Sequence, residues 1–178
     1  VEAESRGLSN VKDSADALDF FLTKSSKDLF SSTGVLTEVE LEARVDVWRE
    51  IYATKTAIEA NVMCEIAVNQ ILPAAIEYQT TLAGTVASLE ELDIDPSASR
   101  ATLVEVSELV NTVKAETTAM KATIAGIEGS AEEEAKAYCH KVKHTHMEII
   151  RTAVDALEGL VDDELWPLPK YREMLFIK

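Results

Sequence analysis

Proline, glycine and aromatic residues are scarce in this chain. Its 178 residues include 4 Pro and 6 Gly, and aromatic residues make up 6% of the total. Because proline and glycine are the residues that most often end helices and form turns, their scarcity favours long helices with few connections. We therefore expect an all-α fold, and the length is that of one domain with one hydrophobic core.

Basic residues are also few. The chain has 17 Lys and Arg against 32 Asp and Glu, which gives a formal net charge of −15. Nucleic-acid binding needs a basic face, and anionic membrane surfaces repel an acidic protein, so both kinds of partner are disfavoured. The longest apolar runs stay well below the roughly 18 residues needed to cross a bilayer, so we expect no membrane-spanning helix.

Only two cysteines are present, Cys64 and Cys139, and both lie inside predicted helices. Two such cysteines do not form the framework of a disulfide-rich domain, and they indicate a reducing, cytoplasmic compartment. The first residue is Val1 rather than Met. We therefore expect a processed chain or a fragment of a longer one.

The motifs of common active sites are missing as well. The glycines fit neither G-x-x-x-x-G-K-[ST] nor G-x-G-x-x-G, so no phosphate-binding loop is expected. A di-metal helical bundle uses E-x-x-H pairs, but Ala137, Lys141 and Lys143 stand three residues before the three histidines. We expect no catalytic, cofactor-binding or metal-binding residue in this segment.

Two alternatives concern the histidine-rich helix. His140 and His144 are four residues apart and could share one metal ion, but the sequence shows no third ligand, and a polar helix face flanked by lysines is the simpler interpretation. Cys139 and His140 are adjacent, and adjacent helical residues point in different directions, so they form no catalytic pair. Cys139 is expected to be a small core residue.

The chain divides into predicted helices with recognisable ends. Residues 11–30 carry an apolar stripe broken by TKSSKD, which indicates one irregular helix or two short ones. Thr37 and Glu40 then form a T-x-x-E capping box that opens a long helix. Pro73 interrupts this helix, because proline lacks the backbone donor and clashes with the preceding turn, so a kink or a restart is expected there.

A second long hairpin follows. Asp95 is a good N-cap and Pro96 suits the first helical position. Ser130 and Glu133 form another capping box that opens the last long helix. Between them lies a heptad-like seam, Leu103, Val106, Val110, Val113, Thr117, Met120, Ile124 and Ile127. We expect an antiparallel helical bundle with a long Pro-kinked helix and a heptad-patterned hairpin.

Two groups of aromatic residues invite competing interpretations. Trp48 and Tyr52 are four residues apart and could form a ligand box, although this spacing is usual for a core. Trp166 and Leu168 each precede a proline, so the WPLP segment is expected to be extended. A proline-rich recognition motif would need P-x-x-P rather than P-x-P, so we favour an apolar strap that docks on the bundle or on a neighbour. Its proposed structural anchors, together with Pro73 and Trp48 in the long helix, are Trp166, Pro167, Leu168, Pro169, Tyr171 and Phe176.

Three stretches carry a family resemblance. TEVELEARVDVW (37–48), ILPAAIEYQ (71–79) and LEGLVDDELWPLPKYREMLF (157–176) together resemble the C-terminal region of type III glutamine synthetases. The resemblance runs in order from Ser14 to Lys178, although 86–135 has no identifying motif of its own. It implies residues 1–12 as a linker from an upstream catalytic domain, 13–164 as the helical bundle and 165–178 as the strap.

The resemblance also implies a parent enzyme. Type III glutamine synthetases join ammonia to glutamate with ATP and Mg²⁺ or Mn²⁺, in a large ring-built homo-oligomer, and their catalytic machinery lies upstream of this region. The N-G-S-G-x-H stretch is missing here, so no catalytic residue carries over and the segment alone should be inactive. The alternative is an independent helical scaffold or adaptor. An open reading frame that continues upstream into a ligase domain would discriminate between the two hypotheses.

Overall fold

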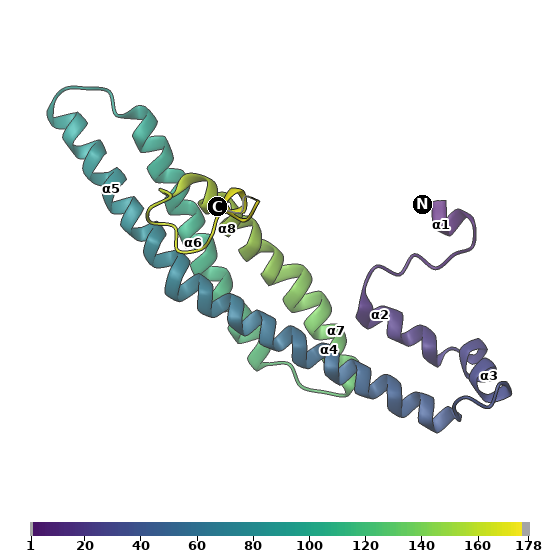
Figure 1. The fold of residues 1–178 in the computed structure, drawn as a ribbon. Coiled ribbons are helices and arrows are strands. Elements are labelled where there is room, and N and C mark those ends of the chain that lie inside the picture. Colours follow the sequence, from purple (N-terminus) through teal and green to yellow (C-terminus); the bar gives the residue numbers. More distant parts are fainter. Residues whose placement is uncertain (1, 176–178) are drawn as a thin grey trace. The chain divides into compact units, whose positions relative to one another are not determined.

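The computed structural model describes residues 2–175, and these form helices and no strand (Figure 1). The all-α expectation is therefore confirmed. The chain divides into two compact units. The first contains Val1–Ala60 and Thr123–Thr145, and the second contains Asn61–Ala122 and His146–Lys178. The helix α4 (Glu38–Ile66) and the π-helical segment η3 (Tyr138–Met147) each contribute residues to both units.

The first unit begins with short helices. One turn, α1 (Glu2–Ser5), precedes α2 (Ser14–Asp19), the 3-10 turn η1 (Phe20–Leu22) and α3 (Lys24–Ser32). The expected irregular segment at 11–30 is thus two short helices joined by a tight turn. This unit also contains α7 (Ala131–Ala137), which continues into η3. Ala15, Ala135 and Cys139 pack together with Tyr52 against them.

The two predicted capping boxes are present. The Thr37 amide donates to Glu40 Oε2 at 2.8 Å, and the Glu40 amide donates back to Thr37 Oγ1 at 3.3 Å. Ser130 and Glu133 make the same reciprocal pair at the start of α7. These hydrogen bonds satisfy amides that have no partner within the helix, which is why α4 and α7 begin at these residues.

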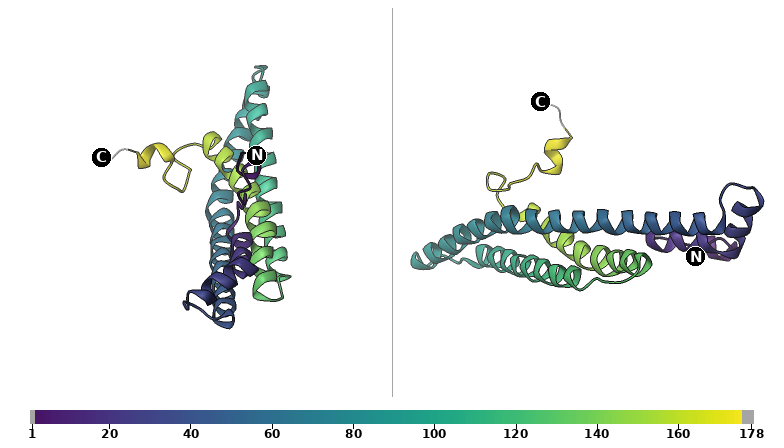
Figure 2. Two further views of the ribbon diagram at one scale, coloured as in Figure 1. Left: turned by 90° about the vertical axis from the view of Figure 1, so that its right-hand side faces the viewer. Right: turned by 90° about the horizontal axis from the view of Figure 1, so that it is seen from below.

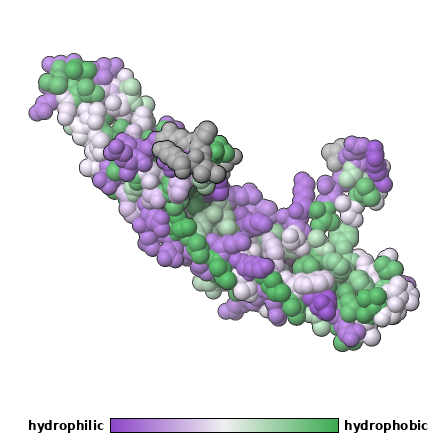
Figure 3. All heavy atoms as spheres, in the orientation of Figure 1, coloured by the Kyte–Doolittle hydropathy of each residue, from purple (hydrophilic) through white to green (hydrophobic). Residues whose placement is uncertain are grey.

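Helix α4 is apolar on two opposite sides. Its buried side consists of residues spaced by three or four, namely Leu41, Val45, Arg49, Ala53, Thr56, Ala60 and Cys64. Val47, Ile51 and Ile58 lie on the opposite side, and 46–59% of their surface is exposed. Figure 3 shows apolar residues interrupting the polar surface along α4. One side of α4 therefore packs within the chain while the other stays uncovered.

The second unit is built around three helices. Helix α4 ends in a π-helical turn, η2 (Ala67–Ile71), and α5 (Leu72–Glu91) begins directly after it. Asp95 accepts a hydrogen bond from the Ser97 amide at the start of α6 (Ser97–Ala125), and α8 (Glu148–Leu160) completes the group. Five of the eight predicted seam residues are buried positions of α6, namely Val106, Val110, Val113, Thr117 and Met120. Heptad packing along this seam stays a prediction.

Pro73 is the second residue of α5 and is exposed. The π-helical turn η2 ends two residues before it, at Ile71, so the backbone hydrogen bonds change register close to the point where the proline removes a donor. Helix α5 begins one residue before the proline, at Leu72. The predicted bend at this point stays a prediction.

Lys170 in the strap at the end of the chain contacts the residues that directly follow α8. Lys170 Nζ lies 2.5 Å from Asp163 Oδ1 and donates to the Val161 carbonyl at 3.2 Å. The short helix α9 (Tyr171–Met174) follows, and it stands off from α5, α6 and α8 in both views of Figure 2. Leu175 is 58% exposed. Whether the strap docks on the bundle or on a neighbour stays a prediction. The Tyr171 side chain and Phe176 lie outside the described part of the chain.

Candidate functional site

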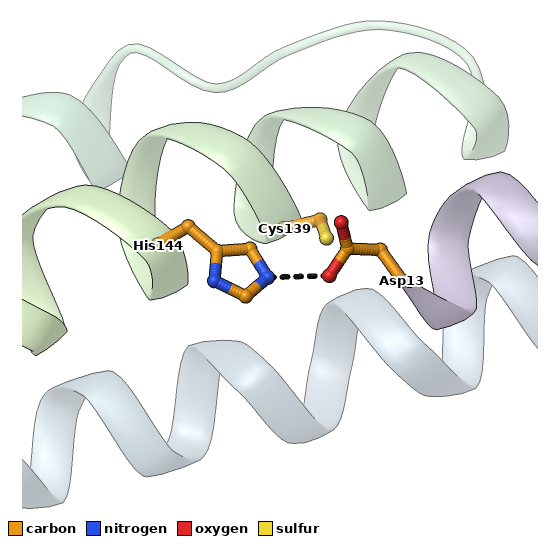
Figure 4. Close-up of side chains that lie close together, drawn as sticks. All are labelled: Asp13, Cys139 and His144. Atoms are coloured by element: carbon orange, nitrogen blue, oxygen red, sulfur yellow. Dashed lines mark hydrogen bonds and ion pairs between the residues drawn. The ribbon is translucent and has the colours of Figure 1, made fainter. Parts of the chain in front are cut away.

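Chemically reactive side chains gather in the first unit between α2 and η3. The carboxylate of Asp13, the thiol of Cys139 and the imidazole of His144 place one ligand atom each within 4.8 Å of one another (Figure 4). His144 Nε2 and Asp13 Oδ1 are 2.6 Å apart, a short charge-assisted hydrogen bond. A second set shares Asp13 and adds Asp16 and His140, with His140 Nε2 3.3 Å from Asp16 Oδ1.

The π-helical geometry of η3 brings Cys139 and His144 together. In an α-helix, residues five apart differ by about 140° around the axis and cannot share a ligand. In a π-helix each residue pairs with the fifth one along, so these two side chains lie one above the other. The Thr145 hydroxyl donates to the His140 carbonyl at 2.9 Å, which follows the same five-residue step. Sequence reasoning assumed α-helical spacing and therefore missed this pair.

Asp13 supplies the third donor because it precedes α2. Its extended backbone, with φ −116° and ψ 142°, is the conformation of an N-cap, but its side chain makes no cap hydrogen bond. The carboxylate is directed at His144 instead (Figure 4). No sequence signal links Asp13 to a residue 131 positions later, so only the fold could reveal the pairing.

Tyr52 borders this cluster from α4. It packs against Ala15, Ala135 and Cys139. Burial of the phenol, together with a hydrogen bond to Cys139, raises the pKa of Tyr52 above its ordinary value. The phenol therefore stays protonated and can donate to sulfur. This makes Tyr52 a supporting neighbour of the thiol rather than an acid or base near neutral pH.

A second polar cluster centres on Arg49, which is 5% exposed. Its guanidinium lies 2.6 Å from Asp19, 3.2 Å from Asp46 and 3.1 Å from Glu132. Lys136 joins from α7, 2.7 Å from Asp19 Oδ2. The group ties α2, α4 and α7 together, so it is a structural network within the first unit.

The aromatic residues singled out from the sequence lie in two places. Trp48 is half-buried and packs on Phe21, with ring centroids 5.2 Å apart and planes at 59°. These rings, with Ile51 and Tyr52, line a shallow groove of about 340 Å³ on the first unit. In the second unit, Trp166 is 7% exposed, Leu168 is half-buried, and Pro167 and Pro169 are exposed. That these residues act as anchors stays a prediction.

The described residues do not fit ATP. Gly7, Gly34 and Gly129 have positive φ angles, but they lie in three separate connections. A phosphate-binding loop needs several closely spaced backbone amides, and residues 2–175 offer no such loop.

Comparison with known proteins decides the family. The family model described as the glutamine synthetase C-terminal domain matches residues 1–90, half of the chain. The chain belongs to this family. A glutamine synthetase from Bacteroides fragilis is 35% identical over 99% of the chain. A type-3 glutamine synthetase from Dictyostelium discoideum is 31% identical over 99%, and a glutamine synthetase from Butyrivibrio fibrisolvens is 27% identical over 98%.

This glutamine synthetase C-terminal domain spans 25% of the length of each of these relatives. The family model ends at residue 90, but the relatives align with nearly the whole chain, including the segment 86–135 that has no identifying motif. The resemblance to the C-terminal region of type III glutamine synthetases is therefore confirmed. No helix in the described residues is long and apolar enough to cross a membrane.

Proposed function

We propose that this chain is the non-catalytic C-terminal domain of a cytoplasmic type III glutamine synthetase, and that it completes the fold and supports assembly of a ring-built homo-oligomer. The whole protein would make glutamine from glutamate, ammonia and ATP with Mg²⁺ or Mn²⁺. Its upstream catalytic domain would supply the chemistry. Family membership and the relatives' names support the activity of the whole protein.

The proposal that this domain supports assembly rests on the uncovered side of α4. Val47, Ile51 and Ile58 are large apolar residues on one face, opposite the face that packs within the chain. Fully burying such side chains contributes about 1.5–3 kcal/mol each, so a helix that leaves three of them in water has a surface suited to a partner. We infer that the catalytic domain or another subunit covers this face.

The test places a charge on the uncovered side in the whole enzyme. Ile58→Glu should reduce the mass of the assembly and lower ligase activity in proportion, because a buried unpaired carboxylate opposes association. Ala115→Glu adds the same charge at an exposed position of α6 and should leave the assembly unchanged. Mass photometry and activity assays measure both effects. An Ile58→Glu enzyme with the full mass would contradict the assembly role.

A further inference from the structure

We propose that Asp13, Cys139 and His144 form a binding site for a zinc-like divalent transition-metal ion. The inference does not depend on the proposed assembly role. It rests on the three donor atoms that the structure places within 4.8 Å of one another in the first unit.

The types of donor define the class of metal. Thiolate and imidazole are ligands of Zn²⁺ and its neighbours in the first transition row, whereas Mg²⁺ and Ca²⁺ prefer sets of oxygen ligands. Three protein ligands with a fourth position for water are enough for a tetrahedral zinc site. Asp16 and His140 form a second set of possible ligands that shares Asp13.

The geometry needs only a small adjustment. In a tetrahedral site with bonds of 2.0–2.3 Å, neighbouring ligand atoms are roughly 3.3–3.8 Å apart. The present donors lie within 4.8 Å, and His144 Nε2 is 2.6 Å from Asp13 Oδ1. Side-chain rotations that separate the His–Asp pair and bring the sulfur closer would give this geometry. The half-buried carboxylate and the partly exposed imidazole leave a route for the ion from solvent.

The proton and charge balance also favours a cation. Binding would replace the thiol proton of Cys139 with the metal and release that proton to solvent. A dication with one thiolate, one carboxylate and one neutral imidazole carries no net charge, and the chain as a whole has a net charge of −15. Tyr52, which packs against Cys139, would help to orient the sulfur in the way that outer-shell groups do.

Cobalt titration of the reduced full chain tests the proposal. Co²⁺ bound to a thiolate gives a charge-transfer band in the near ultraviolet, which carboxylate and imidazole ligands alone do not produce. We expect one equivalent of Co²⁺ to develop this band and Zn²⁺ to abolish it by displacement. Absence of the band in the reduced chain would overturn the proposal.

Matched variants assign the ligands. Cys139→Ser should abolish the band, whereas Cys64→Ala, which removes the other buried thiol, should retain it. Asp13→Asn and His144→Gln should weaken Zn²⁺ binding at least tenfold in competition titrations. His146→Gln, whose imidazole faces Glu116 at 2.8 Å, should bind like the parent chain.

Folding of each variant is checked by circular dichroism. If Cys139→Ser fails to fold, the Zn²⁺ affinities of Asp13→Asn and His144→Gln test the proposal instead, because both of these side chains are partly exposed. A band that survives in Cys139→Ser, or an affinity unchanged in both Asp13→Asn and His144→Gln, would refute the site. The cluster would then contain the ion pair between His144 and Asp13 but no metal site.

Discussion

Arg49 and Asp19 lie 30 residues apart in the sequence, and their guanidinium and carboxylate are 2.6 Å apart. The Arg49 side chain is buried, whereas Asp19 is 37% exposed. Because a buried cation must keep its partners, this pair fixes how the end of α2 sits on α4.

Removing the cation should destabilise the first unit. Arg49→Ala is expected to lower the free energy of unfolding by about 1–3 kcal/mol, because it removes a buried side chain and one of the two cations that pair with Asp19 and Glu132, leaving only Lys136. The carboxylates are partly exposed and can be hydrated, which keeps the cost below that of a fully buried pair. Denaturant unfolding measures the change. Arg44→Ala, at an exposed position of α4, is the control and should be nearly neutral.

The same network predicts sensitivity to acid. Burial alone would raise the pKa of Asp19, but hydrogen bonds from Lys136 and Arg49 outweigh it and hold the pKa below the ordinary value. A lowered pKa in the folded state contributes stability that is present above the unfolded value, about 4. That contribution is lost as pH falls from there through the folded pKa. Asp19→Asn should flatten the decline in stability below pH 4, and an unchanged profile would contradict this account.

Trp166 leads to a prediction with two parts. Its indole Nε1 is buried and has no hydrogen-bond partner among the described residues. Trp166→Ala should lower the free energy of unfolding by about 3–5 kcal/mol through lost packing. Trp166→Phe removes the unpaired donor and keeps most of the apolar volume, so it should cost much less. Thermal unfolding of the chain compares the two, and equal midpoints for Trp166→Ala and the parent would rule out an anchor within the chain.

Pro73 tests whether the interruption of the long helix is required by packing. Proline inside a helix costs about 3 kcal/mol relative to alanine. If the surrounding helices demand the π-helical turn at Ala67–Ile71, Pro73→Ala should change the free energy of unfolding by less than about 1 kcal/mol. A gain near the full helical value would show that the proline merely interrupts a helix that is otherwise regular.

The chain by itself should have no ligase activity. Residues 2–175 offer no phosphate-binding loop, and the sequence carries no catalytic stretch that could be transferred from the family. Glutamate- and ammonia-dependent hydrolysis of ATP by the purified chain would contradict this prediction. The whole enzyme assayed in parallel is the positive control.

The sequence by itself determined the helices and their ends. Capping residues act within four positions of each other, so Thr37 with Glu40 and Ser130 with Glu133 could be recognised from spacing alone. The buried positions of α6 followed from steps of three and four for the same reason. Family membership could also be predicted from the sequence, because each of the stretches 37–48, 71–79 and 157–176 is an unbroken run of residues.

Only the tertiary structure decided which polar groups meet. The partners Asp13 and His144 are separated by 131 residues, and no local rule connects them. Cys139 joined them because η3 is π-helical, a departure from α geometry that helical periodicity does not reveal. The strap shows a milder form of this limit: its prolines predicted an extended path, but not that Lys170 pairs with Asp163 and the Val161 carbonyl, seven and nine residues earlier. Contacts between distant residues depend on packing of the whole chain, and that information is not local to any motif.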